Sequence, residues 1–249
     1  MFSSTERDLS LIQITPEKML VISCDSLGGI GLKEEDKVEV SNQIVGRFTL
    51  RVALMELLAV GVEPITIVNN LSVEYENTGK EIIAGIKEEL GIIDLDSADL
   101  LTGSTEENIE TVQTGMGITA IGLAEVKELD LAASQDGDLL VAIGKPKVGA
   151  EVLAAAEEIA DLKAMKDLRN IDYIHDLLPV GSKGISYEAS LLAQINNLKL
   201  ELKESPLDLD KSAGPATVVL AALEPDKVNK LREEINKPLT VIGKLKSRN

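Results

Sequence analysis

The sequence predicts an α+β fold in which helices cover one face of a sheet. Short apolar runs with strand character alternate with helical patterns up to residue 144, in the order strand, strand, helix, strand, helix, strand, strand. The composition is 44% apolar but only 2% aromatic, so aliphatic side chains must fill the cores. At 249 residues the chain is long enough for one large domain or two smaller ones.

In the first half, strands are predicted from apolar runs bounded by turn residues, and helices from apolar positions that recur with a helical period. A hairpin is expected from residues 9–14 and 19–23, around the turn Thr15-Pro16-Glu17-Lys18. The other expected elements are helices at 43–61 and 74–90, each closed by a glycine, and strands at 64–71, 115–126 and 138–144. Residues 100–108 are expected to form a polar turn between two buried segments.

Residues 145–149, Lys-Pro-Lys-Val-Gly, combine proline, glycine and charge directly after a strand, and they predict a domain boundary. The expected domains are 1–145 and 146–249. This stretch does not match the phosphate-binding Walker pattern, because no Ser or Thr follows Lys147. Beyond it we expect helices at 150–168, 186–196 and 225–235, and strands near 173–180, 217–223 and 239–245.

The formal net charge of −17 disfavours binding to nucleic acids or anionic membranes. Cys24 is the only cysteine and His175 the only histidine, which excludes a Cys/His zinc cluster. Carboxylates bridged to phosphates by Mg²⁺ are compatible with this composition. His175 beside Asp176 suggests acid-base chemistry, but a lone histidine near a strand end is more often structural.

No apolar run approaches the ~20 residues that a membrane span requires. The first residues, Met-Phe-Ser-Ser-Thr-Glu-Arg, lack the basic flank and apolar stretch of a signal peptide. These features predict a cytoplasmic protein.

Residues 100–108 are the first candidate site, because hydroxyls, carboxylates and a glycine stand together there. The backbone around Gly103 and Ser104 can offer N–H groups to phosphate oxygens, and Thr105 and Glu106 can offer oxygens to a phosphate-bound metal. This is the chemistry that phosphoryl transfer needs. A solvated connection is an equally reasonable interpretation of the same residues.

A second candidate site begins where the hairpin ends. Asp25 stands at the mouth of the predicted strand and is followed by Gly28 and Gly29, a pattern that fits a metal or nucleotide site or a simple turn. Asp8, just before residue 9, is another candidate acid. Glu56 is the single acid inside an apolar helix, so it lies either at the solvent edge or against a partner such as a metal.

The third candidate is Gly181-Ser182-Lys183-Gly184, which precedes a predicted helix and resembles an anion cradle. Lys183 would be the phosphate partner, and Asp176 could orient an acceptor hydroxyl. An ordinary exposed turn explains the same four residues.

The order of these motifs resembles the aminoimidazole-ribonucleotide synthetase (PurM-like) superfamily, which includes thiamine-monophosphate kinase. The resemblance is carried by Asp-Ser-Leu-Gly-Gly-Ile-Gly at 25–31, by the apolar helix and Gly-x-x-Pro at 45–64, by Thr-Gly-Ser-Thr at 102–105 and by residues 176–185. It implies a two-domain α+β fold whose first sheet pairs with that of a second subunit in a dimeric β-barrel. It also implies ATP and magnesium as cofactors and a small-molecule substrate.

Carried over by position, the resemblance makes Asp8, Asp25 and Glu56 the metal ligands. It makes Gly28 and Gly29, together with residues 103–106, the nucleotide-binding residues. Asp176 and Lys183 would lie on the substrate side. Within the superfamily, Arg7-Asp8-Leu9 and residues 103–108 resemble most the α-ribazole kinases, which phosphorylate the lower-ligand nucleoside of cobalamin.

Three positions depart from the superfamily pattern: Ala53 stands for the usual Asn, Glu56 for Asp, and Ser104 for the loop Asp. These departures count against a thiamine-monophosphate kinase of ordinary type, although an enzyme like it stays an alternative. They also leave open a non-catalytic nucleotide-binding protein with the same fold.

Overall fold

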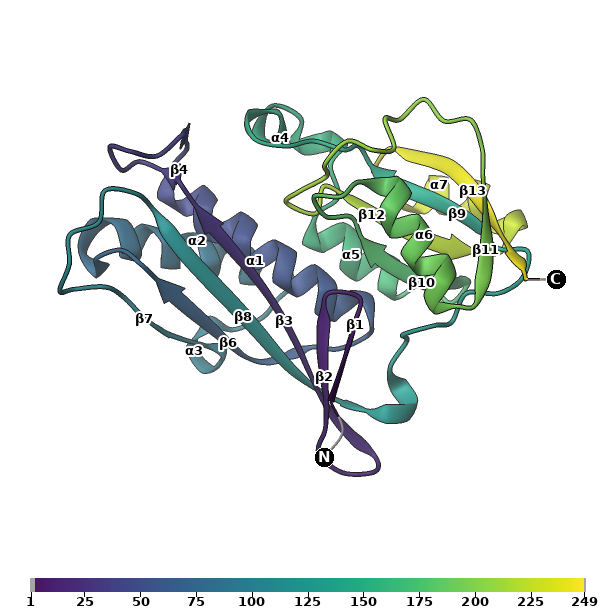
Figure 1. The fold of residues 1–249 in the computed structure, drawn as a ribbon, viewed down its shortest axis with the longest axis horizontal. Coiled ribbons are helices and arrows are strands. Elements are labelled where there is room, and N and C mark those ends of the chain that lie inside the picture. Colours follow the sequence, from purple (N-terminus) through teal and green to yellow (C-terminus); the bar gives the residue numbers. More distant parts are fainter. Residues whose placement is uncertain (1–2, 249) are drawn as a thin grey trace. The chain divides into compact units, whose positions relative to one another are not determined.

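The computed structural model describes residues 3–248, and these divide into two compact units. The first unit comprises Met1–Leu57 and Val62–Glu128, and the second comprises Leu58–Gly61 and Leu129–Asn249. Each unit combines one main sheet with helices, so the fold is mixed α and β as predicted (Figure 1). Within residues 3–248, no helix has both the length and the apolar content needed to cross a membrane.

The first unit is built on a six-stranded sheet with the order β1-β2-β3-β8-β6-β7. Its strands are β1 (Ser3–Glu6), β2 (Leu9–Gln13), β3 (Lys18–Gly28), β6 (Pro64–Leu71), β7 (Leu101–Ser104) and β8 (Gly115–Glu125). A separate parallel pair consists of β4 (Ile30–Gly31) and β5 (Val38–Glu39). The predicted hairpin and the strands at 64–71 and 115–126 are confirmed. Among the described residues the sheet is open and does not close into a barrel.

Helices α1 (Asn42–Ala59), α2 (Lys80–Gly91) and the short α3 (Ser97–Leu100) belong to the same unit. The Oγ of Ser23 on β3 donates a 2.6 Å hydrogen bond to the Ala53 carbonyl of α1, which fixes α1 against one face of the sheet. A buried ion pair joins α1 to α2, because Glu89 accepts from Arg51 Nε at 2.7 Å and from Arg47 Nε at 3.1 Å. The apolar periodicity of both helices is thus explained by this packing.

The helix predicted from residue 74 begins only at Lys80. Residues Tyr75–Gly79 form an irregular turn, in which Asn77 has φ 73° and ψ −80°, outside the helical region. Glu74 holds this turn by accepting from the Thr78 hydroxyl and from Lys33 Nζ. Side-chain contacts with Glu74 therefore override the helical propensity of the sequence at this point.

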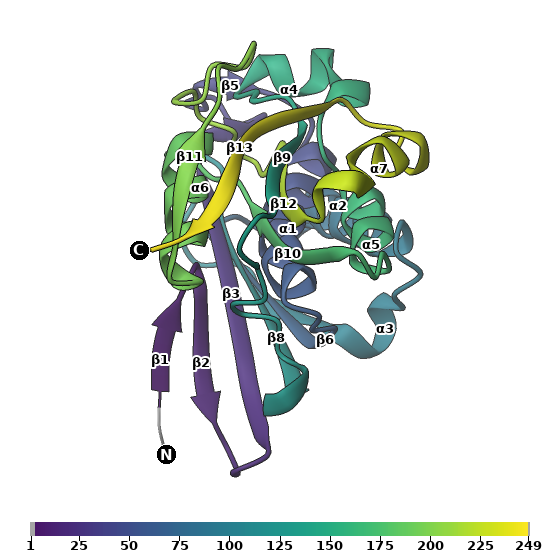
Figure 2. The same cartoon turned by 90° about the vertical axis from the view of Figure 1, so that its right-hand side faces the viewer.

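The second unit contains a five-stranded antiparallel sheet with the order β10-β12-β9-β13-β11. Its strands are β9 (Leu139–Gly144), β10 (Ile174–Pro179), β11 (Leu198–Leu202), β12 (Val218–Leu223) and β13 (Leu239–Ser247). Helix α6 (Ile185–Ile195) packs Leu192 and Ala189 into the same core as Leu140 and Leu220, and Figure 2 shows α6 beside β11. Strand β11 was missed by the sequence analysis, although Leu-Lys-Leu-Glu-Leu alternates in the manner of a strand.

Strand β9, which the sequence analysis assigned to residues before the boundary at 145, pairs with β12 and β13 inside the second unit. The stretch expected to link two domains is also held there: Lys145 N donates to the Glu158 carbonyl at 2.9 Å, and Lys147 N donates to Thr217 Oγ1 at 3.1 Å. The first compact unit ends at Glu128, and the second, which also includes Leu58–Gly61, continues from Leu129.

The single helix predicted at 150–168 is broken into α4 (Ala150–Ala154), a 3₁₀ turn (Ala156–Glu158) and α5 (Leu162–Arg169). The break has two causes. Ala160 N donates to the Thr217 carbonyl at 2.8 Å, and the Asp161 side chain caps α5 by accepting from Ala164 N at 2.8 Å. The predicted helix at 225–235 is a 3₁₀ turn (Pro225–Lys227) followed by α7 (Val228–Glu234).

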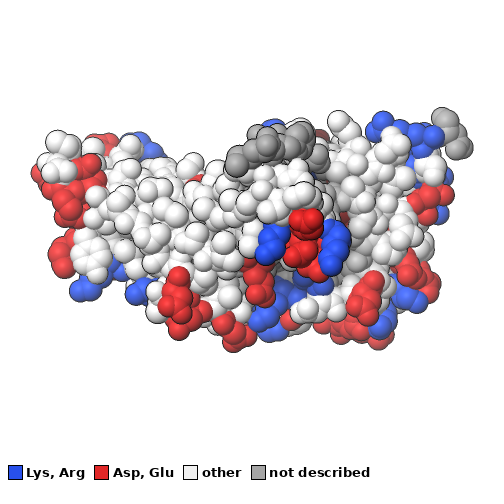
Figure 3. All heavy atoms as spheres, turned by 90° about the horizontal axis from the view of Figure 1, so that it is seen from below, with Lys and Arg blue, Asp and Glu red and all other residues white. Residues whose placement is uncertain are grey.

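Charged groups of both signs are interspersed on the face drawn in Figure 3, where red carboxylate side chains lie beside blue basic ones. This mixed surface differs from the contiguous basic stripe that a nucleic-acid backbone would need.

Candidate functional site

Three strand ends meet at one end of the first sheet. Strands β3 and β6 both pair antiparallel with β8, so they run in the same direction, and β7 pairs parallel with β6. The carboxyl ends of β3, β6 and β7 therefore lie at the same end of the sheet. Two of the segments singled out in the sequence, around residues 25 and 103, are brought together there even though they lie far apart in the chain.

The first cross-strand row at this end is Asp25, Ile118, Asn69 and Gly103, in that order across four strands. Residues directly opposite each other in a sheet point to the same face. Asp25 therefore points to the face on which Ser23 meets α1, because the two residues are separated by two positions on β3. Its side chain is half-buried, and this burial raises the pKa of the Asp25 carboxyl to about 6, although a hydrogen bond with the Ser26 backbone partly offsets the effect.

The second row is Ser26, Gly117, Asn70 and Ser104, and it points to the opposite face. The side chains of Ser26, Asn70 and Ser104 are all exposed, while Gly117 contributes no side chain. The result is a short polar surface with a glycine in its floor, which we call the polar row. A ligand can approach the backbone of β8 closely here and receive hydrogen bonds from two hydroxyls and one amide.

The predicted loop at 100–108 is a strand over its first half, because β7 pairs with β6 through Leu101–Ser104. The sequence-based expectation of a free turn was wrong for these residues. Asn69 Nδ2 donates to the Thr102 carbonyl at 3.0 Å, so a side chain as well as the ladder holds β7 in place. Ser104 is consequently fixed at the end of a strand rather than carried on a mobile loop.

The acids that follow Ser104 hold the chain in its path. Glu106 accepts hydrogen bonds from Asn108 N at 2.7 Å and Ile109 N at 3.1 Å, and these backbone donors keep the pKa of the Glu106 carboxyl below its usual value. Glu107 accepts from Tyr75 N at 2.8 Å and from Thr105 Oγ1 at 2.7 Å. Both carboxylates therefore stabilise the turn, Glu106 through its Oε1.

Gly28 and Gly29 lie at the carboxyl end of β3. Gly28 is exposed and pairs with Gly115, whereas Gly29 has φ 69° and donates its N–H to the Thr114 carbonyl at 2.8 Å. The Gly29 amide is thus used inside the protein. Of the two predicted nucleotide-binding glycines, only Gly28 presents an exposed backbone.

The three predicted metal ligands are all in the first unit, but they are not brought together. Asp8 is exposed in the turn between β1 and β2, and Glu56 is buried on α1 with 7% of its surface exposed. In the range 3–248, no group of three or more His, Cys, Asp or Glu side chains is arranged to hold a metal ion. These residues do not fit a metal held by the protein alone. Asp25 fits a magnesium ion that takes its other ligands from phosphates and water.

The predicted catalytic acid Asp176 lies in the second unit, on β10, with only 2% of its surface exposed. Its Oδ2 accepts from Asn196 Nδ2 at 2.9 Å and from Ser134 Oγ at 3.2 Å. A buried carboxylate bonded in this way anchors the structure and does not meet an acceptor hydroxyl. The neighbouring His175 contacts Asp138 through Nδ1 at 2.8 Å, which is the structural role that was preferred for it.

Lys183 is exposed at the turn before α6, where its Nζ donates to the Tyr187 hydroxyl at 3.0 Å and lies 4.1 Å from the centre of that ring. Part of the expected anion cradle around it is engaged by hydrogen bonds within the protein. Ser186 N donates to the Leu209 carbonyl at 2.8 Å, and Ala213 N donates to the Gly181 carbonyl at 3.1 Å. The turn is therefore occupied by the segment that connects β11 to β12.

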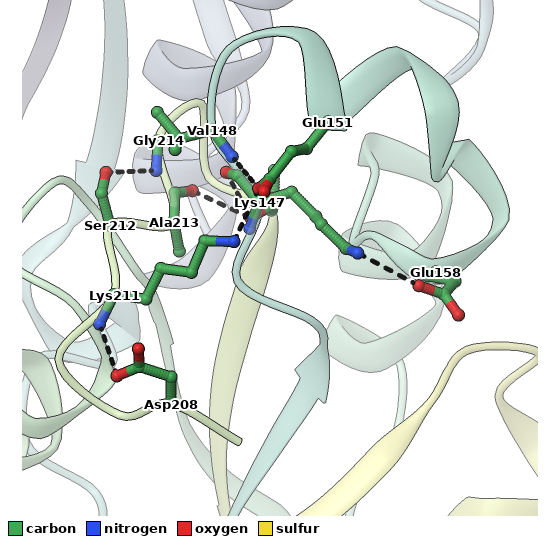
Figure 4. A network of polar contacts seen from close by, with 10 residues as sticks. Lys147, Val148, Glu151, Glu158, Asp208, Lys211, Ser212, Ala213 and Gly214 are labelled. Carbon is green, nitrogen blue, oxygen red and sulfur yellow. Dashed lines mark hydrogen bonds and ion pairs between the residues drawn. The ribbon is translucent and has the colours of Figure 1, made fainter. Parts of the chain in front are cut away.

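That connecting segment is fixed by a network of polar contacts drawn in Figure 4. Lys211 Nζ donates to Glu151 Oε2 at 2.6 Å, and Lys211 N donates to Asp208 Oδ1 at 3.2 Å. Lys147 lies 3.4 Å from Glu158 in the same region. These basic residues are neutralised by neighbouring acids, so they do not offer a ready site for phosphate.

Ser26 and Asn70 were not identified from the sequence. Each is an ordinary polar residue in a strand, and only the register between β3, β8, β6 and β7 places them in one row with Ser104. No local signal in the sequence encodes that register, because it depends on pairing between segments that are far apart.

The comparisons with known proteins fit this description. Residues 6–124 match the family model described as AIR synthase related protein, N-terminal domain. No curated protein sequence matches the chain. Solved structures similar to it include the thiamine monophosphate kinase from Aquifex aeolicus, with 15% identity, coverage of 98% of this chain and 90% of that one, and a TM-score of 0.69.

Two further similar structures belong to the same group. The thiamine-monophosphate kinase from Stenotrophomonas maltophilia K279a has 18% identity, covers 99% and 89% of the two chains, and gives a TM-score of 0.67. The structure described as AaThiL complexed with AMPPCP and TMP has 14% identity, covers 98% and 85%, and gives 0.68. Residues 6–124 are therefore similar to an AIR synthase-related N-terminal domain, and the chain as a whole has a fold similar to that of the thiamine-monophosphate kinases.

Proposed function

We propose that this protein is an ATP- and magnesium-dependent kinase that phosphorylates a small hydroxylated substrate. The observation that carries the proposal is the polar end of the first sheet, where a half-buried carboxyl on one face and three exposed hydrogen-bonding side chains on the other meet at the ends of β3, β6 and β7. Support comes from the fold, which is similar to that of a protein complexed with AMPPCP, an analogue of ATP.

In this proposal the protein acts by positioning and charge stabilisation, as phosphoryl transfer requires little covalent chemistry from side chains. Bound magnesium would neutralise phosphate charge, and Asp25 is the carboxylate best placed to hold it. Asp8 and Glu56 are the other acids that the family resemblance assigns to metal. The exposed backbone at Gly28 would bind the phosphate oxygens. The hydroxyls of Ser26 and Ser104 and the amide of Asn70, on the other face of the sheet, would bind the hydroxylated acceptor.

The best candidate acceptor is α-ribazole, which would be converted to α-ribazole 5′-phosphate in salvage of the cobalamin lower ligand. This choice rests on the resemblance of Arg7-Asp8-Leu9 and residues 103–108 to the α-ribazole kinases. Thiamine monophosphate is the alternative acceptor, which the fold similarity favours.

We also propose that the active form is a homodimer. On the face of the first sheet opposite α1, the apolar side chain of Leu123 is 40% exposed, at the end of β8 away from the polar row. Pairing of this part of the face with that of a second copy would bury Leu123, leave the polar row accessible and form the barrel that the family resemblance implies.

The test is release of ADP from Mg-ATP in the presence of α-ribazole, thiamine monophosphate or aminoimidazole-ribonucleotide precursors. We expect turnover with one acceptor, and a loss of about 10- to 100-fold in kcat/KM for Ser104→Ala and Asn70→Ala. Ser10→Ala is the matched control, because Ser10 is an exposed strand serine on β2, outside the polar row.

Two other outcomes would change the conclusion. Binding of Mg-ATP without turnover on any of these acceptors would identify a non-catalytic nucleotide-binding protein. The absence of both turnover and magnesium-dependent ATP binding would overturn the proposal entirely.

A further inference from the structure

We propose that the free edge of the second sheet, formed by β11, joins the same edge of a second copy of this chain as an antiparallel pair of strands. The inference is independent of the kinase proposal, because every residue that carries it lies in the second unit and outside the polar row. Its basis is the combination of unpaired backbone groups, an adjoining groove and a strand sequence that complements itself.

Strand β11 is an edge strand, since β13 is its only neighbour in the sheet formed by the described residues. Antiparallel ladders alternate, so every second residue directs its N–H and C=O away from the neighbouring strand. Lys203 N donates to the Ile242 carbonyl of β13 at 2.9 Å, which sets the alternation. The backbone groups of Leu198, Leu200 and Leu202 therefore point to the open side.

The partner strand confirms this alternation. The N–H groups of Leu245 and Ser247 on β13 turn away from β11, donating to the Asp138 carbonyl at 2.8 Å and to Asp136 Oδ1 at 2.7 Å. On the open side, only the Leu198 carbonyl accepts a bond from a described residue, Arg248 Nε at 3.0 Å. The edge thus offers a row of backbone donors and acceptors to another strand.

A groove of about 730 Å³ runs along this edge, between β11 and α6. Its wall on the α6 side is formed by the small side chains of Ser190 and Ala193, which leave room for an added strand. At the end of β11, Leu202 is 50% exposed. The space beside the edge is consequently both accessible and partly apolar.

The sequence of β11, Leu-Lys-Leu-Glu-Leu, identifies a second copy as the occupant. In an antiparallel pair centred on Leu200, Lys199 faces Glu201 of the second copy, and Leu198 faces Leu202 of the second copy. The two-fold axis repeats each contact, so two ion pairs form on one face and the leucines form an apolar seam on the α6 side. Opposite charges placed across strands in this way stabilise the pairing.

Within one chain, Lys199 is attracted by Glu201, which is itself paired with Lys246. Lys199 stands directly opposite Lys246 across the β11–β13 ladder, where like charges repel. Glu201 lies 2.6 Å from Lys246 and is the acid of β11. Glu201 of the second copy would bring a carboxylate to the open side of Lys199.

A five-residue strand pair buries far less than the ~1,600 Å² of a standard stable interface, so association should be weak, in a range of roughly micromolar to millimolar Kd. Sedimentation velocity of the full chain over a range of concentrations measures the Kd of this association. We expect the average mass to rise with concentration through a step that depends on β11.

Charge exchange tests the register. Lys199→Glu places two carboxylates opposite each other across the two-fold axis, and we expect association to weaken at least about 10-fold. The same change sets a carboxylate opposite Lys246 in its own chain, so thermal stability should not fall. Lys199→Glu combined with Glu201→Lys restores opposite charges between the copies and should recover most of the association.

A backbone change tests the edge itself. Leu202→Pro removes an N–H that points to the open side, and a proline is tolerated at such a position. Leu202→Thr is the matched control, because it keeps that N–H. We expect the proline variant to lose association and the threonine variant to keep it.

The variant Leu123→Asp on β8 distinguishes association through the first sheet from association through β11. It should leave the β11-dependent step unchanged. The proposal is overturned if the wild-type chain shows no concentration-dependent step, or if that step is equal in the Lys199→Glu and Leu202→Pro variants. Capture of a strand from a different protein, with no self-association, would also overturn it.

Discussion

Asn69 and Gly103 face each other across β6 and β7, and the Asn69 carbonyl oxygen occupies the place where a Cβ at residue 103 would stand. The Asn69 side chain packs over the same point and donates to Thr102. Glycine is therefore needed at position 103 to let the two strands approach and to fix Ser104 in the polar row. Its requirement comes from packing, whereas the sequence pattern had suggested a phosphate-binding loop.

We predict that Gly103→Ala destabilises the protein by about 2–3 kcal/mol, because the added methyl group overlaps the backbone of β6. Urea unfolding of the variant and the wild type measures this loss in the free energy of unfolding. Gly117→Ala is the control in the adjoining strand, where a Cβ would meet only the Asp25 carbonyl at 4.0 Å. A similar loss in both variants would show that strand glycines are costly to replace here in general.

Asp25 should make the stability of the protein depend on pH. Its pKa rises from 3.8 to about 6 on folding, so the folded state binds a proton more tightly than the unfolded state between these values. Stability contributed by this group is therefore lost as the pH rises through that window. Asp25→Asn should be more stable than the wild type by ~1–2 kcal/mol at pH 7.5, after allowance for partial solvent exposure.

The gain in the Asp25→Asn variant should largely disappear by about pH 4, where the carboxyl is protonated in the folded state and increasingly so in the unfolded state. Chemical unfolding at pH 4 and pH 7.5 tests both points. Under the kinase proposal the same variant loses magnesium-dependent turnover, so stability and activity change in opposite directions. An equal difference between variant and wild type at the two pH values would contradict the burial of Asp25.

The ion pair between α1 and α2 should be important for stability. Glu89 has a fully buried side chain and binds both Arg51 and Arg47. Glu89→Gln leaves the mostly buried Arg51 without its counter-charge, and we expect a loss of about 3–5 kcal/mol.

The control for this pair is Asp167→Asn, which breaks the exposed i,i+4 pair with Lys163. That change should cost at most ~0.5 kcal/mol. Differential scanning calorimetry of the two variants compares them directly, and similar Tm values would argue against a structural role for Glu89.

Asp176 and Ser104 should respond in opposite ways to mutation. Asp176→Asn weakens the buried bonds to Asn196 and Ser134, and we expect a loss of about 1–3 kcal/mol in stability with little change in kcat. Ser104→Ala, at an exposed position, should reduce turnover with a nearly unchanged Tm. ADP release and thermal unfolding measured on the same samples test this. A folded Asp176→Asn variant without activity would restore Asp176 as a catalytic candidate.

Much of the fold follows from local patterns. The hairpin at the start, helix α1, strand β6 and strand β8 were all expected near their observed bounds, because each is a periodic apolar segment bounded by clear turn residues. The errors have particular causes. The helix expected at 150–168 is broken because Ala160 bonds to Thr217. Strand β7 forms where the sequence predicts a loop, because its partner β6 lies far away in sequence.

Part of the candidate site could likewise be predicted from the sequence, and part could not. Composition and spacing alone identified Asp25, Gly28 and Ser104 as chemically suited to a phosphate or metal, and the single cysteine and histidine excluded a zinc cluster. Tertiary structure decided which of these groups are available. Asp176 is buried and hydrogen-bonded inside the protein, and Glu106 Oε1 accepts from two backbone N–H groups, while Ser26 and Asn70 stand in one row with Ser104.

The physical reason is the range of the interactions concerned. Helix periodicity, turn residues and charge are written in consecutive positions, and the sequence by itself determined them. Strand register, the burial that raises the pKa of Asp25 and the partners of each carboxylate depend on segments separated by tens of residues. Only the tertiary structure decided these, because a one-residue slip in register would have turned every side chain to the other face.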